Sequence, residues 1–212
     1  MNTEELSRLS ELGVATVYEA SGREGLLDLP LTQLLPGSRV AGPARTVWCG
    51  QDDNLMVHAV IEQIQPGEVL VLTMPEPNPV ALVGELLATQ MKVRGAAAVL
   101  VDAAIRDVDE LTTLGLPIWS RFIRVRGATK TKIGELNVTV SFGGVRITPG
   151  DIVVLDADGG VCIPRERSEE ALKASEARFE REARLREKLV AGEISYDLHG
   201  LREYVEKSRR KP

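Results

Sequence analysis

The segment from residue 84 to residue 107, GELLATQMKVRGAAAVLVDAAIRD, decides the fold. Its first half is typical of a helix, which we expect to cover Val80–Val93 and to stop at Gly95. Ala98–Val101 is a continuous apolar run, which predicts a buried strand that ends at Asp102. A helix that leads into a buried strand is the repeating unit of α/β proteins.

Other parts of the chain extend this α/β pattern. A long charged helix is expected over Ser168–Val190, and shorter helices over Thr3–Leu12, Thr16–Ser21, Asn54–Gln63 and Val108–Leu114. Apolar runs predict strands at Val40–Cys49, broken early by Gly42-Pro43, and at Val69–Leu72, Pro117–Trp119, Val138–Phe142, Ile152–Leu155 and Val161–Ile163. We find no internal repeat in the 212 residues. The simplest expectation is one compact mixed α/β domain with a helical C-terminal extension, which packs on the core or on a neighbouring subunit.

The composition narrows the class of function. The chain is 43% hydrophobic and 27% charged, with a net charge of −5. This acidic balance argues against a nucleic-acid partner, because phosphate contacts need clustered cations on the protein. The four cations near the end of the chain are expected to be solvated: Lys207, Arg209, Arg210 and Lys211. No run of 18 apolar residues is present, and the first ten residues are polar, so we expect no membrane partner and a cytoplasmic location. The two cysteines lack metal-binding spacing and are expected to be free, buried thiols.

Three charged residues stand where the predicted strand ends, namely Asp102, Arg106 and Asp107. Ligands gather at the carboxyl ends of strands in open α/β sheets, and the small Ala103-Ala104 between these residues would let a ligand approach. Two carboxylates and a guanidinium suit a metal-assisted reaction on an anionic substrate. The alternative is a solvated turn with local ion pairs.

The residues Gly84, Glu85, Leu86 and Leu87 form a second candidate site. Free amides at the start of a helix bind anions, although Gly84 could instead serve close helix packing while Glu85 points to water. His58 is placed by its spacing on the apolar face of a short helix, where a satisfied core or edge residue is the expected outcome.

The combined motifs resemble the RraA-like family, whose enzymatic members are class II 4-hydroxy-4-methyl-2-oxoglutarate / 4-carboxy-4-hydroxy-2-oxoadipate aldolases. The resemblance rests on residues 84–107 followed by L-x-x-L-G-L-P-I-W-S-R, together with N-x-x-x-x-A-V-I-E from Asn54, P-G-E-V-L-V from Pro66 and P-G-D-I-V-V-L-D-A-D-G-G-V-C-I-P-R-E from Pro149. It covers about Thr3 to Leu189. It implies a layered α/β/β fold of the swivelling-domain type in one domain, with an RraA-like catalytic domain at 1–165 and a C-terminal helix and tail at 166–212. It also implies a homotrimer or a dimer of trimers.

The resemblance also implies roles for the residues singled out above. Asp107 would ligate Mg²⁺ or Mn²⁺, and Arg106 would stabilise the enolate formed from a 2-oxo acid substrate. The amides of residues 84–87 would hold the substrate carboxylate, and Glu85 would position a water that carries protons. Asp102 is a weaker candidate for orienting that water. Glu193 is the candidate for an acidic residue that a neighbouring subunit contributes.

Two positions depart from the family pattern, because Ala103 and Phe122 stand where glycine is usual. If the amide of residue 103 binds substrate in a left-handed conformation, alanine there costs roughly 1 kcal/mol, and Phe122 beside Arg121 would reshape the pocket wall. The implied activity is retro-aldol cleavage of a 4-hydroxy-2-oxo acid to give pyruvate, with oxaloacetate decarboxylation as a related reaction. The alternative is a regulator that binds and inhibits a ribonuclease. Regulators of that kind can lack the acidic member of the Arg-Asp pair, which this chain retains.

Overall fold

The computed structural model describes residues 1–209, so Arg210 and Lys211 of the basic tail lie outside the described residues. The chain forms two compact units, Met1–Ser175 and Glu176–Pro212. The second unit contains the end of α6 and two short helices that have no buried residue. That this extension packs on the core or on a neighbouring subunit stays a prediction. No helix within the described residues is long and apolar enough to cross a membrane.

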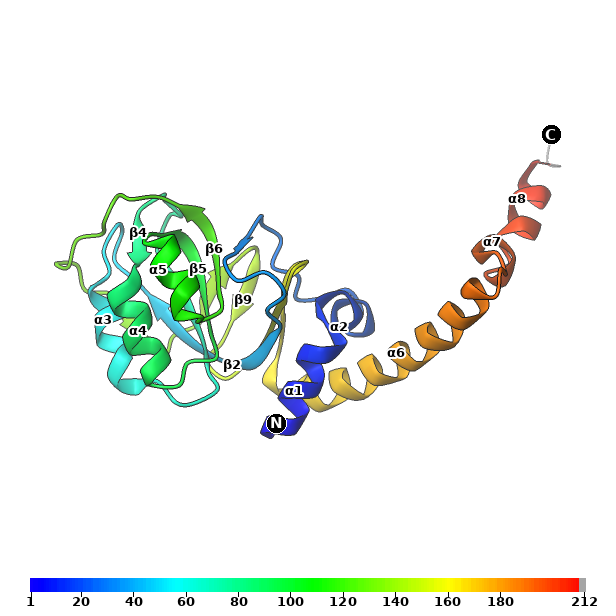
Figure 1. Cartoon of the computed structure of the whole chain (residues 1–212), viewed down its shortest axis with the longest axis horizontal. Coiled ribbons are helices and arrows are strands. Elements are labelled where there is room, and N and C mark those ends of the chain that lie inside the picture. The colour runs from blue at the N-terminus through cyan, green and yellow to red at the C-terminus, as the bar shows by residue number, and fades with distance from the viewer. Residues whose placement is uncertain (210–212) are drawn as a thin grey trace. The chain divides into compact units, whose positions relative to one another are not determined.

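The elements follow the predicted order, with several short additions (Figure 1). The α-helices are α1 (Thr3–Leu12), α2 (Val14–Ala20), α3 (Leu55–Val60), α4 (Glu85–Val93), α5 (Val108–Leu114), α6 (Ser168–Val190), α7 (Ser195–Leu198) and α8 (Leu201–Arg209). The strands are β1 (Thr32–Gln33), β2 (Val40–Trp48), β3 (Val69–Thr73), β4 (Ala81–Val83), β5 (Ala98–Ile105), β6 (Ile118–Ile123), β7 (Glu135–Leu136), β8 (Val140–Phe142), β9 (Val145–Ile147), β10 (Ile152–Asp156) and β11 (Gly159–Ile163). Short 3₁₀ turns cover Ile61–Gln63 and Arg165–Arg167.

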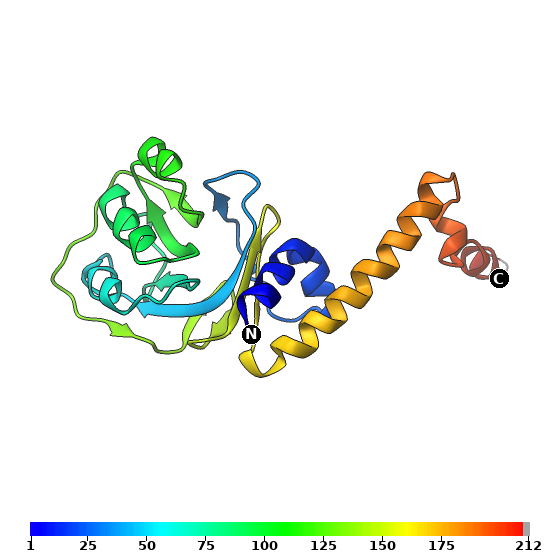
Figure 2. The same ribbon diagram turned by 60° about the horizontal axis from the view of Figure 1, so that its bottom comes forward.

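One curved sheet of nine strands organises the described part of the first unit, in the order β1-β6-β5-β3-β2-β10-β11, with β4 beside β5 and β7 beside β2. It closes into a nearly complete barrel. Strand β2 passes unbroken through Gly42-Pro43, so the predicted early break is wrong. The strand changes partner there, because residues 40–43 pair antiparallel with β10 and residues 44–48 pair parallel with β3. In Figure 2 this strand, in light blue, curves along the sheet.

Three apolar clusters fill the layers around the sheet. Helices α3, α4 and α5 cover the outer face of the parallel strands (Figure 1), where the alternate residues Val99, Val101, Ala103 and Ile105 of β5 are buried. The inner face packs around Trp119 and receives the β8–β9 hairpin. Helices α1 and α2 cover β10 and β11 together with the first turns of α6. This arrangement confirms the predicted α/β/β layering in a single domain with a C-terminal helix.

Two predicted boundaries around the central segment are wrong. Val80–Val93 is not one helix. Ala81–Val83 forms β4, which pairs with β5, and α4 begins only at Glu85. A run of four apolar residues has no periodicity that separates strand from helix. Likewise β5 does not end at Asp102 but continues to Ile105. Ala103 and Ala104 are buried in the sheet, so they do not leave the expected space for a ligand to approach.

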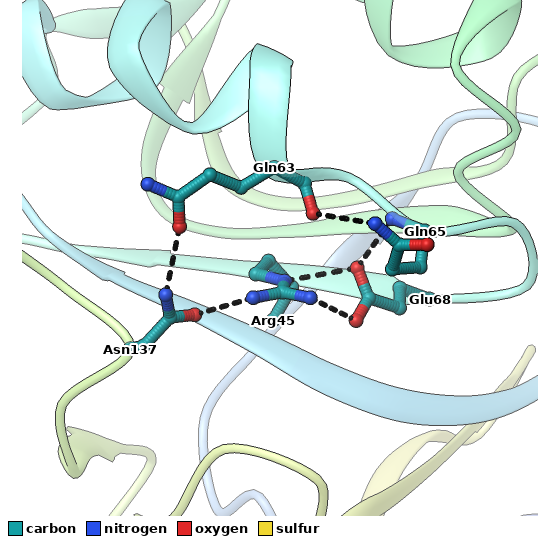
Figure 3. A network of polar contacts seen from close by, with 5 residues as sticks. All are labelled: Arg45, Gln63, Gln65, Glu68 and Asn137. Atoms are coloured by element: carbon teal, nitrogen blue, oxygen red, sulfur yellow. Dashed lines mark hydrogen bonds and ion pairs between the residues drawn. The ribbon is translucent and has the colours of Figure 1, made fainter.

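A polar network fastens the turn before β3 to the neighbouring strand (Figure 3). The Arg45 guanidinium donates to both oxygens of Glu68, at 2.9 and 2.6 Å, and to Asn137 Oδ1 at 2.8 Å. Asn137 Nδ2 in turn donates to Gln63 Oε1 at 2.8 Å. The Arg45 and Glu68 side chains are largely buried, so the bidentate pair fixes one orientation of the turn and with it the start of β3.

Candidate active site

The Arg106-Asp107 pair stands immediately after β5, where the chain turns into α5. The Arg106 amide donates to the Val83 carbonyl at 3.1 Å, which joins the ends of β4 and β5. Asp107 then adopts a left-handed conformation, with φ 62° and ψ 48°. Aspartate tolerates this conformation better than most residues do. The turn therefore places both charged side chains just beyond the end of β5, where they line a cavity.

The carboxylate of Asp107 caps helix α4. Its Oδ2 accepts the amide of Glu85 at 3.0 Å, and the Arg106 Nε lies 3.8 Å from the same oxygen. The next two amides, those of Leu86 and Leu87, have no acceptor within residues 1–209. The carbonyls that precede them by one turn are already taken, because Leu82 accepts from Asn54 and Val83 accepts from Arg106. The helix therefore presents two free N–H donors beside the Arg-Asp pair, which is the arrangement of an anion site.

Gly84 allows this close approach of α4 to the Arg-Asp pair. A Cβ at this position would lie 2.5 Å from Asp107 Oδ2 and 3.2 Å from Arg106 Nε. Gly127 plays a similar part on the other side of the guanidinium, since a Cβ there would lie 2.9 Å from Arg106 Nη1. The glycine of the sequence motif is thus explained by the space that the Arg106 and Asp107 side chains need beside the start of α4.

These groups line one cavity of about 210 Å³. The residues around it come from α3, the β4–α4 junction, the β5–α5 turn and the segment after β6: Asn54, His58, Ala81, Gly84, Leu86, Leu87, Arg106, Asp107, Gly127, Ala128 and Lys130. The structure therefore brings together Gly84, Leu86, Leu87, Arg106 and Asp107. Asn54 is buried, and its Oδ1 atom has no hydrogen-bond partner among the described residues.

His58 and Lys130 add two ionisable groups that the sequence did not assign to the site. His58 is not a core residue, because its side chain is exposed and lines the cavity, so of the two expected placements only the edge position fits. Partial burial and the charge of Lys130 both lower the pKa of His58 below its usual value. Asn54 is the N-cap residue of α3 and His58 follows it by four residues, a spacing that predicts two side chains on the same side of a helix. Lys130 lies in an irregular segment with no local pattern to reveal it.

A buried carboxylate, Asp53, holds both walls of the cavity in place. Its Oδ1 accepts the amide of Leu55 at the start of α3, at 2.8 Å. Its Oδ2 accepts Thr129 Oγ1 at 2.6 Å and the amides of Thr131 and Lys132 at 2.7 and 3.1 Å. Burial by itself raises the pKa of Asp53, but these hydrogen bonds outweigh it and lower the pKa to about 2. One side chain therefore positions His58 and Lys130 together.

Replacing Asp53 by asparagine is expected to destabilise the fold by roughly 2 kcal/mol at neutral pH, because the buried side chain loses the charge that strengthens its four hydrogen bonds. The folded pKa lies below the unfolded value of 3.8, so the wild-type carboxylate stabilises the fold above pH 4 and loses this effect as the pH falls toward 2. Urea unfolding between pH 2 and pH 7 should therefore show a smaller pH dependence for Asp53→Asn than for the wild type. The exposed Asp158→Asn is the control, and an equal change in both variants would contradict the assignment.

Glu85 and Asp102 are not among the residues that line the cavity. The Glu85 carboxylate accepts Thr89 Oγ1 at 2.9 Å and faces a neighbouring surface hollow. Asp102 lies within β5 and pairs with Arg121 at 2.9 Å in a separate cleft. Ala103 is buried in the strand without a positive φ, so the strain that we expected there is absent. Glu193 is exposed in the second unit.

The family of the chain follows from sequence comparison. The RraA-like family, described as Aldolase/RraA, matches residues 14–162. The chain belongs to the RraA-like family. A protein of Halalkalibacterium halodurans named "Putative 4-hydroxy-4-methyl-2-oxoglutarate aldolase" is 36% identical over 197 residues, which are 92% of this chain and 91% of the relative.

Two solved structures share the fold of this chain. RraAS2 of Streptomyces coelicolor, described as an unusual member of the RNase ES inhibitor RraA protein family, is 31% identical. It aligns with a TM-score of 0.77 over 88% of this chain and 97% of its own. An uncharacterized protein of Pseudomonas syringae pv. tomato aligns with a TM-score of 0.81 over 92% of each chain, and at 24% identity this likeness shows the shared fold alone.

Proposed function

We propose that this RraA-like protein is a divalent-metal-dependent lyase that cleaves a 4-hydroxy-2-oxo acid, of the 4-hydroxy-4-methyl-2-oxoglutarate type, to pyruvate. The observation that carries the proposal is the meeting of Arg106, Asp107 and the free amides of α4 in one cavity. The name of the Halalkalibacterium halodurans relative supports the same activity. Oxaloacetate decarboxylation is the related reaction, because it also leaves a pyruvate enolate.

The donor set fits a metal held by a single protein carboxylate. Within residues 1–209 no group of three or more His, Cys, Asp and Glu side chains could hold a metal, but Oδ1 of Asp107 has no protein partner. Mg²⁺ commonly binds through one or two carboxylates and keeps several waters, and Mn²⁺ accepts the same ligands. We therefore propose Asp107 as the protein ligand, with the substrate and water supplying the other oxygens. The metal would act as a Lewis acid toward the 2-oxo acid.

Each protein group has a separate role in the proposed cleavage. The amides of Leu86 and Leu87 bind the substrate carboxylate, which places the keto oxygen near Arg106. When the C4 hydroxyl loses its proton, the C3–C4 bond breaks and its electron pair moves to the keto oxygen. The guanidinium of Arg106 stabilises the negative charge that develops there. Protonation of C3 then gives pyruvate, and Glu85 has the proposed role of positioning the water that carries the proton.

A test of the function measures pyruvate release from 4-hydroxy-4-methyl-2-oxoglutarate and from oxaloacetate, coupled to NADH oxidation by lactate dehydrogenase. We expect turnover with Mg²⁺ or Mn²⁺, loss of turnover with EDTA, and recovery when the metal is returned. Oxaloacetate also decarboxylates without enzyme, so the rate with metal alone is subtracted. Absence of pyruvate with every divalent metal would contradict the proposal.

The second candidate is a regulator that binds and inhibits a ribonuclease. The description of the Streptomyces coelicolor relative favours it. Retention of Asp107 beside Arg106 favours the enzyme, because a binding surface alone has no need of a carboxylate so arranged. Co-purification with a ribonuclease, together with no pyruvate release, would favour the regulator.

The active assembly belongs to the same proposal. We propose a homotrimer or a dimer of trimers, in which Glu193 of a neighbouring subunit completes the site. Besides the metal and the neighbouring subunit, the proposed reaction requires the small-molecule substrate. Light scattering of the full chain measures the assembly, and a Glu193→Gln variant tests the contribution of that carboxylate to turnover.

A further inference from the structure

A second cleft opens at the carboxyl ends of the parallel strands, on the inner face of the sheet. Strands β2, β3, β5 and β6 are neighbours and run parallel. Their inward-facing residues at this edge are Trp48, Thr73, Asp102 and Arg121. All of these line one cleft of about 420 Å³, and none of its lining residues belongs to the candidate active site. Ligands gather at this edge in parallel sheets.

The base of the cleft is an ion pair between Asp102 and Arg121. Their side chains are only 8% and 33% exposed, and Arg121 Nη1 donates to Asp102 Oδ1 at 2.9 Å. The pairing of β5 with β6 shifts register between Val101 and Ala104, so two residues of β5 stand opposite Arg121. Such bulges re-aim side chains near functional sites. The guanidinium also lies 5.5 Å from the ring centroid of Phe122, and these contacts hold it in a fixed orientation.

The walls of the cleft combine hydroxyls, carboxylates and an aromatic ring. Trp48 is 37% exposed although it is a large apolar side chain. Ser141 brings a hydroxyl and Asp28 a second carboxylate, while the hydroxyl of the buried Thr73 donates to the Val47 carbonyl at 3.2 Å. Two carboxylates against one guanidinium give the lining a formal charge of −1, which disfavours an anion. The guanidinium keeps N–H donors that have no acceptor within the described residues.

We propose that this cleft binds an uncharged polyhydroxylated molecule of monosaccharide size. Each hydroxyl of such a ligand both donates and accepts, so neighbouring hydroxyls match a carboxylate beside a guanidinium without adding charge. The C–H face of a sugar ring packs on the apolar face of an exposed indole, as Trp48 provides. The site is distinct from the one proposed for the 2-oxo acid, and its occupancy is measured without reference to catalysis.

Tryptophan fluorescence of the full-length protein tests the proposal. The chain has two tryptophans, and Trp119 is fully buried, so a quencher such as acrylamide reports chiefly on Trp48. D-glucose, D-galactose and D-ribose are titrated separately, with sodium phosphate and citrate as anionic comparisons. We expect at least one sugar to protect Trp48 from quenching in a saturable manner, and neither anion to do so.

Variants connect the effect to the ion pair. Arg121→Gln should raise the dissociation constant of the sugar at least tenfold, whereas Arg124→Gln, an equal charge change at an exposed position outside the cleft, should leave it unchanged. Because Arg121→Gln leaves Asp102 without its partner, the double variant Asp102→Asn/Arg121→Gln, which pairs two neutral amides, is measured beside it and should also bind weakly. Protection by anions alone, protection by none of the compounds, or unchanged sugar binding in the folded double variant would each overturn the proposal.

Discussion

Asp107→Asn is expected to lower pyruvate release about a thousandfold, or ~4 kcal/mol in transition-state stabilisation, and to abolish its response to added metal. The substitution is nearly isosteric. In the wild type the Glu85 amide donates a hydrogen bond to Asp107 Oδ2 at 3.0 Å, and the side-chain oxygen of asparagine can accept the same bond. It also tolerates the left-handed conformation of this position. The fold should therefore survive, and the loss should reflect the missing negative charge.

The matched control for this variant is Asp109→Asn. Asp109 lies two positions further on, in the exposed first turn of α5, and loses the same charge. Steady-state rates at several Mg²⁺ and Mn²⁺ concentrations should differ from the wild type by less than about twofold in the control. Metal-dependent turnover that persisted in Asp107→Asn would show that the cation is held by other groups.

Gly84→Ala is expected to lower turnover about a hundredfold with little loss of folded protein. The added Cβ would lie 2.5 Å from Asp107 Oδ2, so the carboxylate and the Glu85 amide that it accepts must separate. The backbone of Gly84 has φ −133°, which alanine adopts freely, so the effect is one of space alone. Steady-state kinetics, with circular dichroism to monitor the fold, would measure it.

Gly37→Ala is the control, because it should change stability and leave turnover unchanged. Gly37 has φ 82° and open space around its Cα, so alanine there strains the backbone without touching the cavity. We expect a stability loss of roughly 1 kcal/mol and unchanged turnover. If both glycine variants kept full activity, close approach at Gly84 would not be required for the reaction.

The sequence predicted the mixed α/β elements because their signals are local and strong, whereas the layering was implied by the family resemblance. Apolar runs such as Val69–Leu72 mark buried strands, and the long charged helix is evident from its composition. The errors fall where a local signal is ambiguous. The four residues Val80–Val83 fit a helix as well as a strand, and pairing with β5, a long-range contact, decides between them.

The candidate site was predicted in part for the same reason. Residues that share one turn, such as Arg106 and Asp107, were found from the motif. Lys130 and Asp53 were missed, since they join the site through hydrogen bonds of the Asp53 carboxylate to a segment more than seventy residues away. Asp102 was associated with Arg106 because it is close in sequence. The alternation of side chains along β5 instead turns it toward the inner face of the sheet.

The change of partner along β2 has a consequence for how the protein is made. Its first half pairs with β10. Pro43 can therefore pair with Ile152 only after the ribosome has added more than a hundred further residues. Until then the early strand keeps an open hydrogen-bonding edge, which is prone to pair with another chain. We therefore expect fragments that stop before β10 to aggregate, and we expect chaperones to engage the nascent chain until β10 emerges from the ribosome.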